Sequence, residues 1–197
     1  WDVARTAQEI ADNWNVALAG NEAGLVSLYQ FAEGAGQTTA DGTASGNDGM
    51  LGDTTAVDEK DPYWVAPGVP LPIDIETARH MTFDGVDDYV NCGNDSSLQI
   101  TGTEITLEAW VNAVAFKDQV WAGCVLTKDS FGPDAGYMLR IGANGQANFN
   151  IGSGGWNEID SPEGTLELDT WYHIAGVYDG VEQKLYVNGT LAASQPL

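Results

Sequence analysis

From residue 80 to its last residue, the chain is a succession of short apolar stretches separated by turn-forming residues. In EITLEAWVNA, residues 104–113, every second residue from Ile105 to Val111 is apolar. This alternation is the pattern of a strand with one buried face. Asn188-Gly189 lies between two such stretches, and this dipeptide is a strong signal for a tight hairpin. Short strands at this spacing predict an all-β fold, a two-sheet antiparallel sandwich.

Further strands are expected at AGCVLTKD, AGYMLRIG, QANFNIG, TWYHIAGVYDG and KLYVNGTLAAS. Closer to the N-terminus, LVSLYQF at residues 25–31 also predicts a largely buried strand. Residues 2–18 predict one short helix, because apolar residues repeat there at a spacing of three to four. Residues 33–49, rich in Gly and small polar residues, predict a long ordered loop. Four prolines in residues 56–72 exclude a central strand.

The charge of the chain limits its partners. Acidic residues outnumber basic ones 29 to 7, and the formal net charge is −22. Such a surface repels phosphate backbones and anionic lipid, which argues against nucleic-acid binding. No apolar run approaches the roughly 20 residues needed to cross a bilayer. The two cysteines, Cys92 and Cys124, are expected to be buried free thiols, with a disulfide between them as the alternative.

Three segments carry sequence motifs in a fixed order: MTFDGVDDYVNCGNDSSLQITGTEITLEAWVNA, then GYMLRIG, then TWYHIAGVYDGVEQKLYVNGTLAAS. Together they resemble the laminin-G-like, concanavalin A-like jelly roll common in bacterial and archaeal surface proteins. The upstream AGLVSLYQFAEGAGQTTADGTASGNDGML resembles the opening strand and glycine-rich loop of that family. The resemblance implies a concanavalin A-like jelly-roll sandwich, here with a short N-terminal helix.

Two departures from the family pattern concern the ends of the chain. The family domain continues past LYVNGTLAAS with further strands, whereas this chain stops at Leu197. Residues 1–22 resemble the strand end and helix that close a preceding repeat. We therefore expect a jelly roll at residues 23–197, taken from a tandem array. The missing strands could come from the N-terminal segment or from a neighbouring chain, or the piece could be a fragment.

Several polar and aromatic side chains are candidates for ligand binding. Glu33, Asp41, Asn47 and Asp48 surround the glycine-rich loop, and their oxygens are the kind that calcium prefers. Related jelly rolls often hold a structural calcium ion, so these four residues are the candidate ligands. The alternative is that they bond to their own backbone in turns. Trp121 and Trp156 are expected in loops, where an exposed indole can stack on a sugar ring.

Glu158, Asp160 and Glu163 reproduce the E-x-D-x-x-E spacing of jelly-roll glucanases. A retaining glycosidase needs two carboxyl groups about 5–5.5 Å apart in a cleft. Pro162 follows closely, and proline cannot donate a hydrogen bond within a sheet. The stretch is therefore expected to be a broken connection between strands rather than a catalytic strand.

The resemblance implies a non-catalytic extracellular module for adhesion on a secreted or cell-surface protein. Expected partners are a glycan, a cell-surface protein or copies of the chain itself. One alternative is a self-assembling fibre or surface-layer subunit completed by strand exchange. The second alternative is a jelly-roll glycoside hydrolase that uses Glu158, Asp160 and Glu163.

Overall fold

A computed structural model describes residues 1–65, 80–130 and 132–197 of the chain. They form two compact units, one made of Trp1–Val16 with Ile100–Leu197 and the other of Ala17–Gln99. This division differs from the boundary expected between residues 22 and 23, because the N-terminal segment folds with the last hundred residues. Part of the proline-rich stretch at 56–72 lies outside the described residues.

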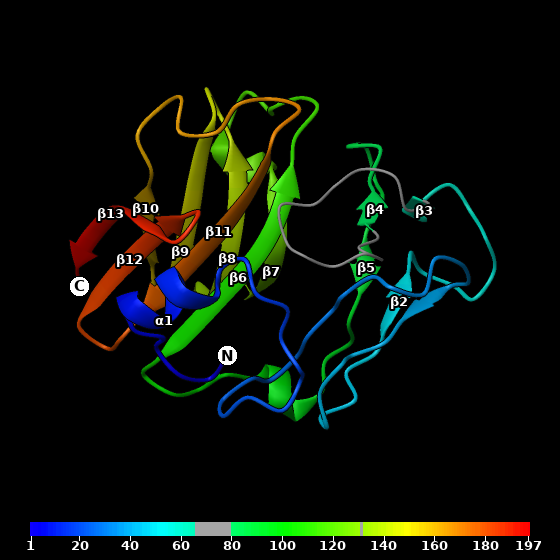
Figure 1. Ribbon diagram of the computed structural model, residues 1–197, viewed down its shortest axis with the longest axis horizontal. Helices are drawn as coiled ribbons and strands as arrows, with labels where there is room; N and C mark the ends of the chain where they lie inside the picture. The colour runs from blue at the N-terminus through cyan, green and yellow to red at the C-terminus, as the bar shows by residue number, and fades with distance from the viewer. Residues whose placement is uncertain (66–79, 131) are drawn as a thin grey trace. The chain divides into compact units, whose positions relative to one another are not determined.

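The larger unit is a sandwich of two four-stranded antiparallel sheets, as the sequence predicted (Figure 1). In spatial order, one sheet contains β13 (Thr190–Pro196), β12 (Glu182–Val187), β11 (Trp171–Tyr178) and β6 (Ile105–Asn112). The other contains β10 (Trp156–Asp160), β9 (Gln146–Ser153), β8 (Ala135–Gly142) and β7 (Cys124–Ser130). A short 3₁₀ helix, η2 (Val120–Ala122), precedes β7.

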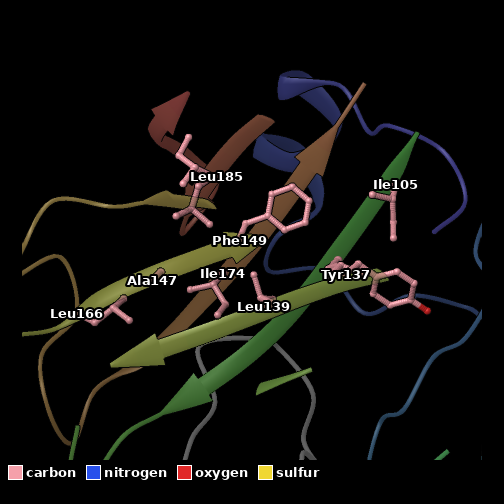
Figure 2. Packing of buried hydrophobic residues seen from close by; sticks show 10 residues of the cluster. Ile105, Tyr137, Leu139, Ala147, Phe149, Leu166, Ile174 and Leu185 are labelled. Atoms are coloured by element: carbon pink, nitrogen blue, oxygen red, sulfur yellow. The ribbon is translucent and has the colours of Figure 1, made fainter. Parts of the chain in front are cut away.

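Alternate residues of the two sheets meet in a shared core. Leu139 and Phe149 come from the β7–β10 sheet, and Ile174 and Leu185 come from the other; all four are fully buried. Figure 2 shows these side chains in one cluster. Burial of each such side chain contributes about 1.5–3 kcal/mol. The alternation seen in the sequence therefore places these side chains in the core that the two sheets share.

The hairpin between β12 and β13 forms where the sequence predicted it. Asn188 and Gly189 have φ values of 48° and 74°, which is the left-handed backbone that a two-residue turn of this kind requires. Val187 and Thr190 pair on either side of the turn. This turn fixes the register of the last hairpin.

The N-terminal segment is a strap, residues 1–14, that lies on the outer face of the β6/β11–β13 sheet (Figure 1). Its helix, α1, spans Ala7–Asn13, which is shorter than the expected 2–18. Thr6 and Glu9 form a reciprocal capping box in which each side chain accepts the backbone N–H of the other. The helix begins at this cap because residues 1–5 are committed to contacts with β6.

The smaller unit has short strands and long connections. Its sheets are β1 (Thr38–Thr39), β2 (Gly49–Leu51) and β5 (Val90–Asn91), and β3 (Tyr63–Val65) with β4 (His80–Thr82); a 3₁₀ turn, η1, spans Ser96–Leu98. The strand expected at 25–31 is absent from the described structure. Leu28 explains this, because its N–H donates to the Asp41 carboxylate and its carbonyl accepts from Gly42. These backbone groups serve a loop instead of a sheet.

Candidate functional site

The acidic stretch around Glu158 forms a regular strand, β10, at Trp156–Asp160. It pairs antiparallel with β9, which places Glu158 opposite Asn150 and Asp160 opposite Asn148. The expectation of a broken connection was therefore wrong for residues 156–160, although the strand does end before Pro162. Pro162 lies beyond the last residue of the strand, where it interrupts no hydrogen bond of the sheet.

Five polar side chains come together on the face of the β7–β10 sheet that points away from the core. Strand pairing sets Arg140 beside Asn148 and Asn148 beside Asp160, and it sets Asn150 beside Glu158. Their odd-numbered neighbours on the same strands point into the core. We call these five residues the polar row. Side chains alternate across a strand, so one face of this sheet builds the core and the other builds the polar row.

Hydrogen bonds link members of the polar row across strands. The Asn148 amide donates to Asp160 Oδ1 at 2.9 Å and to Glu158 Oε2 at 3.5 Å. The Arg140 guanidinium lies 3.8 Å from Glu158 Oε2 and also contacts the Met138 sulfur. One amide therefore holds two carboxylates close together, with a cation on the next strand.

Three polar atoms of the row are buried without a hydrogen-bond partner among the described residues: Asn148 Oδ1, Asn150 Oδ1 and Arg140 Nε. Asn148 is 0% exposed and Asn150 is 1% exposed. Leaving a buried polar group unpaired costs about 1–3 kcal/mol. Two acceptors and one donor on the same face of one sheet are thus unpaired within the described chain, while the neighbouring Glu158 and Asp160 are exposed to solvent.

Both candidate tryptophans lie near this face, but neither is in an irregular loop. Trp156 is the first residue of β10 and points to the same face as Glu158. Trp121 belongs to η2 and is 63% exposed. A Cβ added at Gly142, on the polar-row face of β8, would lie 3.0 Å from Val120 Cα, so η2 covers that end of the face. Trp156 and the η2 turn that carries Trp121 therefore lie near opposite ends of the polar row.

Glu163 does not join the other two acids. It follows Pro162 in a turn, and its carboxylate accepts from the Asn144 amide at 3.2 Å. The E-x-D-x-x-E spacing therefore brings Glu158 and Asp160 onto one face of one strand but leaves the third acid outside the row.

The four candidate calcium ligands instead organise the loop of the smaller unit. Asp41 Oδ1 accepts from the N–H groups of Leu28 and Thr43, and Oδ2 accepts from the N–H of Asn47 and the Thr43 hydroxyl. Burial alone would raise the pKa of Asp41, but these backbone hydrogen bonds hold it below its ordinary value.

The other three side chains are also engaged in this loop. Asp48 accepts from the Asp41 N–H, Glu33 accepts from the Ala40 N–H, and the Asn47 amide donates to the hydroxyls of Ser27 and Ser97. Within the described part of the chain, no three His, Cys, Asp or Glu side chains are grouped to hold a metal ion. In this arrangement the four side chains bond to backbone and hydroxyl groups of the loop, and their role as calcium ligands stays a prediction. Calcium binding elsewhere in the chain stays a prediction, and calorimetric titration of chelator-treated protein tests it.

Sequence reasoning missed Arg140, Asn148 and Asn150. The alternation of QANFNIG was a usable signal, because it places both asparagines on the face opposite Phe149. Their burial could not be foreseen, since it depends on neighbouring strands. Cys92 and Cys124 are free thiols as expected, but Cys92 is only partly buried and Cys124 is exposed.

Comparison with known proteins finds one sequence family and two solved structures that are similar to the chain. A sequence model described as the concanavalin A-like lectin/glucanases superfamily matches residues 84–197. Domain 4 of an extracellular arabinanase from Geobacillus stearothermophilus, solved with arabinotriose, has a TM-score of 0.58 at 15% identity, over 87% of this chain and 75% of that one. An S-layer domain-containing protein from Clostridium thermocellum has a TM-score of 0.44 at 22% identity, over 86% and 71%. No curated protein matches the chain. Among the described residues, no helix is long and apolar enough to span a membrane.

Proposed function

We propose that this chain, which belongs to the concanavalin A-like lectin/glucanases superfamily, is a non-catalytic module that binds a neutral glycan on the polar row. The observation that carries the proposal is the polar row itself, in which two exposed carboxylates lie beside three polar atoms that have no partner in the described chain. The module would act outside the cell, on a secreted or surface protein, where such glycans are found.

The chemistry of the polar row suits a sugar. A sugar hydroxyl both donates and accepts. Asn148 Oδ1, Asn150 Oδ1 and Arg140 Nε are shielded from solvent in this conformation, so a hydroxyl reaches them only when neighbouring side chains move. The carboxylates of Glu158 and Asp160 can accept from neighbouring hydroxyls. Trp156 and Trp121 offer apolar faces for stacking on the ring. The net charge of −22 disfavours a polyanionic glycan, which leaves neutral polysaccharides as the preferred class.

Retardation in native gels that contain a soluble polysaccharide tests this proposal. We expect the chain to migrate more slowly with a neutral polymer, either β-glucan or arabinan, than in an empty gel. Arabinan is included because the arabinanase domain was solved with arabinotriose. We expect no retardation by polygalacturonate beyond that of an inert acidic protein. Unchanged migration with every neutral polymer in a broad panel would contradict the proposal.

A glycoside hydrolase is the second candidate, because Glu158 and Asp160 lie close together on one strand face. Two observations favour binding over hydrolysis. Glu163 lies outside the row, and the Glu158 side chain is 45% exposed rather than enclosed in the apolar pocket typical of a general acid. Reducing-sugar release from β-glucan decides between them. We expect none from the wild type, whereas turnover that Glu158→Gln abolishes would establish the hydrolase.

A further inference from the structure

The strap, residues 1–14, occupies a site on the outer face of β6, β11 and β12. Trp1 and Thr106 exchange both backbone hydrogen bonds, at 3.0 Å and 3.3 Å, so Trp1 extends the free edge of β6. The Thr106 hydroxyl donates to the Val3 carbonyl at 2.8 Å and accepts from the Arg5 N–H at 2.9 Å. The strap thus enters the site in a single backbone register.

A buried ion pair fixes the strap at the centre of the site. Arg5 Nη1 lies 3.0 Å from Glu108 Oε1, and His173 Nε2 lies 3.2 Å from Glu108 Oε2. The Arg5 and Glu108 side chains are only 9% and 13% exposed. The Arg5 guanidinium also stacks over the Trp1 ring, 4.4 Å from its centroid. Burial would raise the pKa of Glu108, yet the hydrogen bond and charge of His173, together with Arg5, hold it below its ordinary value.

Apolar contacts complete the strap site. Ile10 of α1 is 0% exposed and packs with Ala175, Val177 and Tyr186. Further along, the Trp14 ring lies 5.6 Å from the Trp110 ring. Trp14 also packs on the β12–β13 turn, where a Cβ at Gly189 would come within 2.6 Å of the indole. The site is therefore complementary to one particular sequence in charge, shape and register.

An empty strap site would be unfavourable. Without the strap, the Glu108 carboxylate would lose its ion pair with Arg5. Ala175, Val177 and Tyr186 would lose the side chain that covers them. The site therefore needs a strap, but none of its contacts depends on which copy of the chain provides it.

The covalent path between strap and site passes through the smaller unit. The chain leaves the sandwich after Val16, forms the separate unit Ala17–Gln99, and returns at Ile100. The tether between the strap and its own sheet is therefore the whole of Ala17–Gln99. At high protein concentration, capture by a neighbouring copy competes with closure on the same chain. We propose that the strap site is also an interaction surface for a second copy of this chain, which inserts its residues 1–14. Exchange of an identical element between protomers is an established route to assembly.

Charge reversal tests this proposal in the full chain. Arg5→Glu puts a carboxylate against Glu108, and Glu108→Arg puts a guanidinium against Arg5, so each variant alone is mismatched within its own chain. In an equal mixture, each strap finds its matched site on the other variant. Light scattering after size exclusion should give at least the doubled mass in the mixture and the single-chain mass for each variant alone.

Two results would overturn the proposal: a single-chain mass in the mixture, or an equally doubled mass for either variant by itself. The matched control is the double variant Arg5→Glu/Glu108→Arg, which restores the pair within one chain. We expect this control to have the mass of a single chain.

Disulfide trapping covers the case in which charge reversal prevents folding. Trp1 and Thr106 are hydrogen-bonded partners, and such positions have Cα atoms about 5.5 Å apart, within the range of a disulfide. Trp1→Cys and Thr106→Cys are placed in separate, differently tagged chains that also carry Cys92→Ser and Cys124→Ser. Mass mapping after oxidation should find the 1–106 cross-link between tags. Its absence would refute strap exchange if a single chain carrying both cysteines does cross-link.

Discussion

Phe149→Ala is expected to lower the free energy of unfolding of the sandwich by about 3–5 kcal/mol, as measured by denaturant titration. Phe149 is fully buried between the two sheets and lies at the centre of the cluster in Figure 2. Replacing it with alanine removes buried apolar surface and leaves a cavity that strands on both sides can close only in part. Leu191→Ala is a control of the same type, because Leu191 is 51% exposed on β13. It should change the stability by less than about 0.5 kcal/mol.

A double-mutant cycle with Gly176 tests whether this packing is as close as the structure indicates. A Cβ added at Gly176 of β11 would lie 2.4 Å from the Phe149 ring. Gly176→Ala should therefore cost about 1–3 kcal/mol by overpacking in the wild type. In a Phe149→Ala background the same substitution should cost clearly less, because the ring atoms that the new Cβ would meet at 2.4 Å are gone. Equal penalties in both backgrounds would contradict this packing.

Asp41→Ala should be the most destabilising single change in the smaller unit, with a loss of about 2–4 kcal/mol. The substitution leaves the N–H groups of Leu28, Thr43 and Asn47 without their acceptor in the loop. Asp48→Ala is the matched control, because Asp48 is exposed and accepts one backbone N–H, that of Asp41. A loss equal to that of Asp41→Ala would contradict the central role of Asp41.

The same carboxylate predicts a pH dependence. The pKa of Asp41 is lowered in the folded state, so its contribution to stability is fully present above the unfolded value of about 3.9. That contribution is lost as the pH falls through the lower, folded pKa. Thermal unfolding followed between neutral and strongly acidic pH should show this loss in the wild type and a smaller one in Asp41→Asn.

Local patterns were sufficient to predict the sandwich. The alternation in residues 104–113 and the Asn188-Gly189 turn each determine local backbone geometry, and β6 and the last hairpin form where these signals lie. The family motifs then supplied the sheet arrangement. Residues 25–31 show the limit of such patterns, because their strand-like composition is overridden by hydrogen bonds to the distant Asp41.

The candidate site was harder to predict because it is assembled across strands. Glu158 and Asp160 were visible in the sequence, but their partners are set by the register of β8, β9 and β10. The spacing of Arg140 and Asn148 in the sequence does not predict that the two residues are neighbours in the sheet. The strap site poses the same difficulty, since Arg5 and Glu108 meet only after a whole unit has intervened.

Substitution of Asn150 distinguishes a role in ligand binding from a role in folding. Its Oδ1 is buried but has no hydrogen-bond partner in the described structure, so it adds nothing to folding through that atom. Asn150→Ala should therefore leave the stability unchanged or slightly higher, while removing an acceptor from the polar row. If Asn150 had only a structural role, Asn150→Ala would lower the free energy of unfolding and leave glycan affinity unchanged.

Calorimetric titration of the retarding neutral glycan into the wild type, Asn150→Ala, Asp160→Ala and Glu163→Ala is the most direct test of the polar row. We expect the first two variants to bind at least about tenfold more weakly than the wild type, with unchanged circular dichroism. Glu163→Ala, an acid from the same stretch that lies outside the row, should bind like the wild type. Wild-type affinity in both polar-row variants, or an equal loss in Glu163→Ala, would contradict the assignment of the polar row as the binding site.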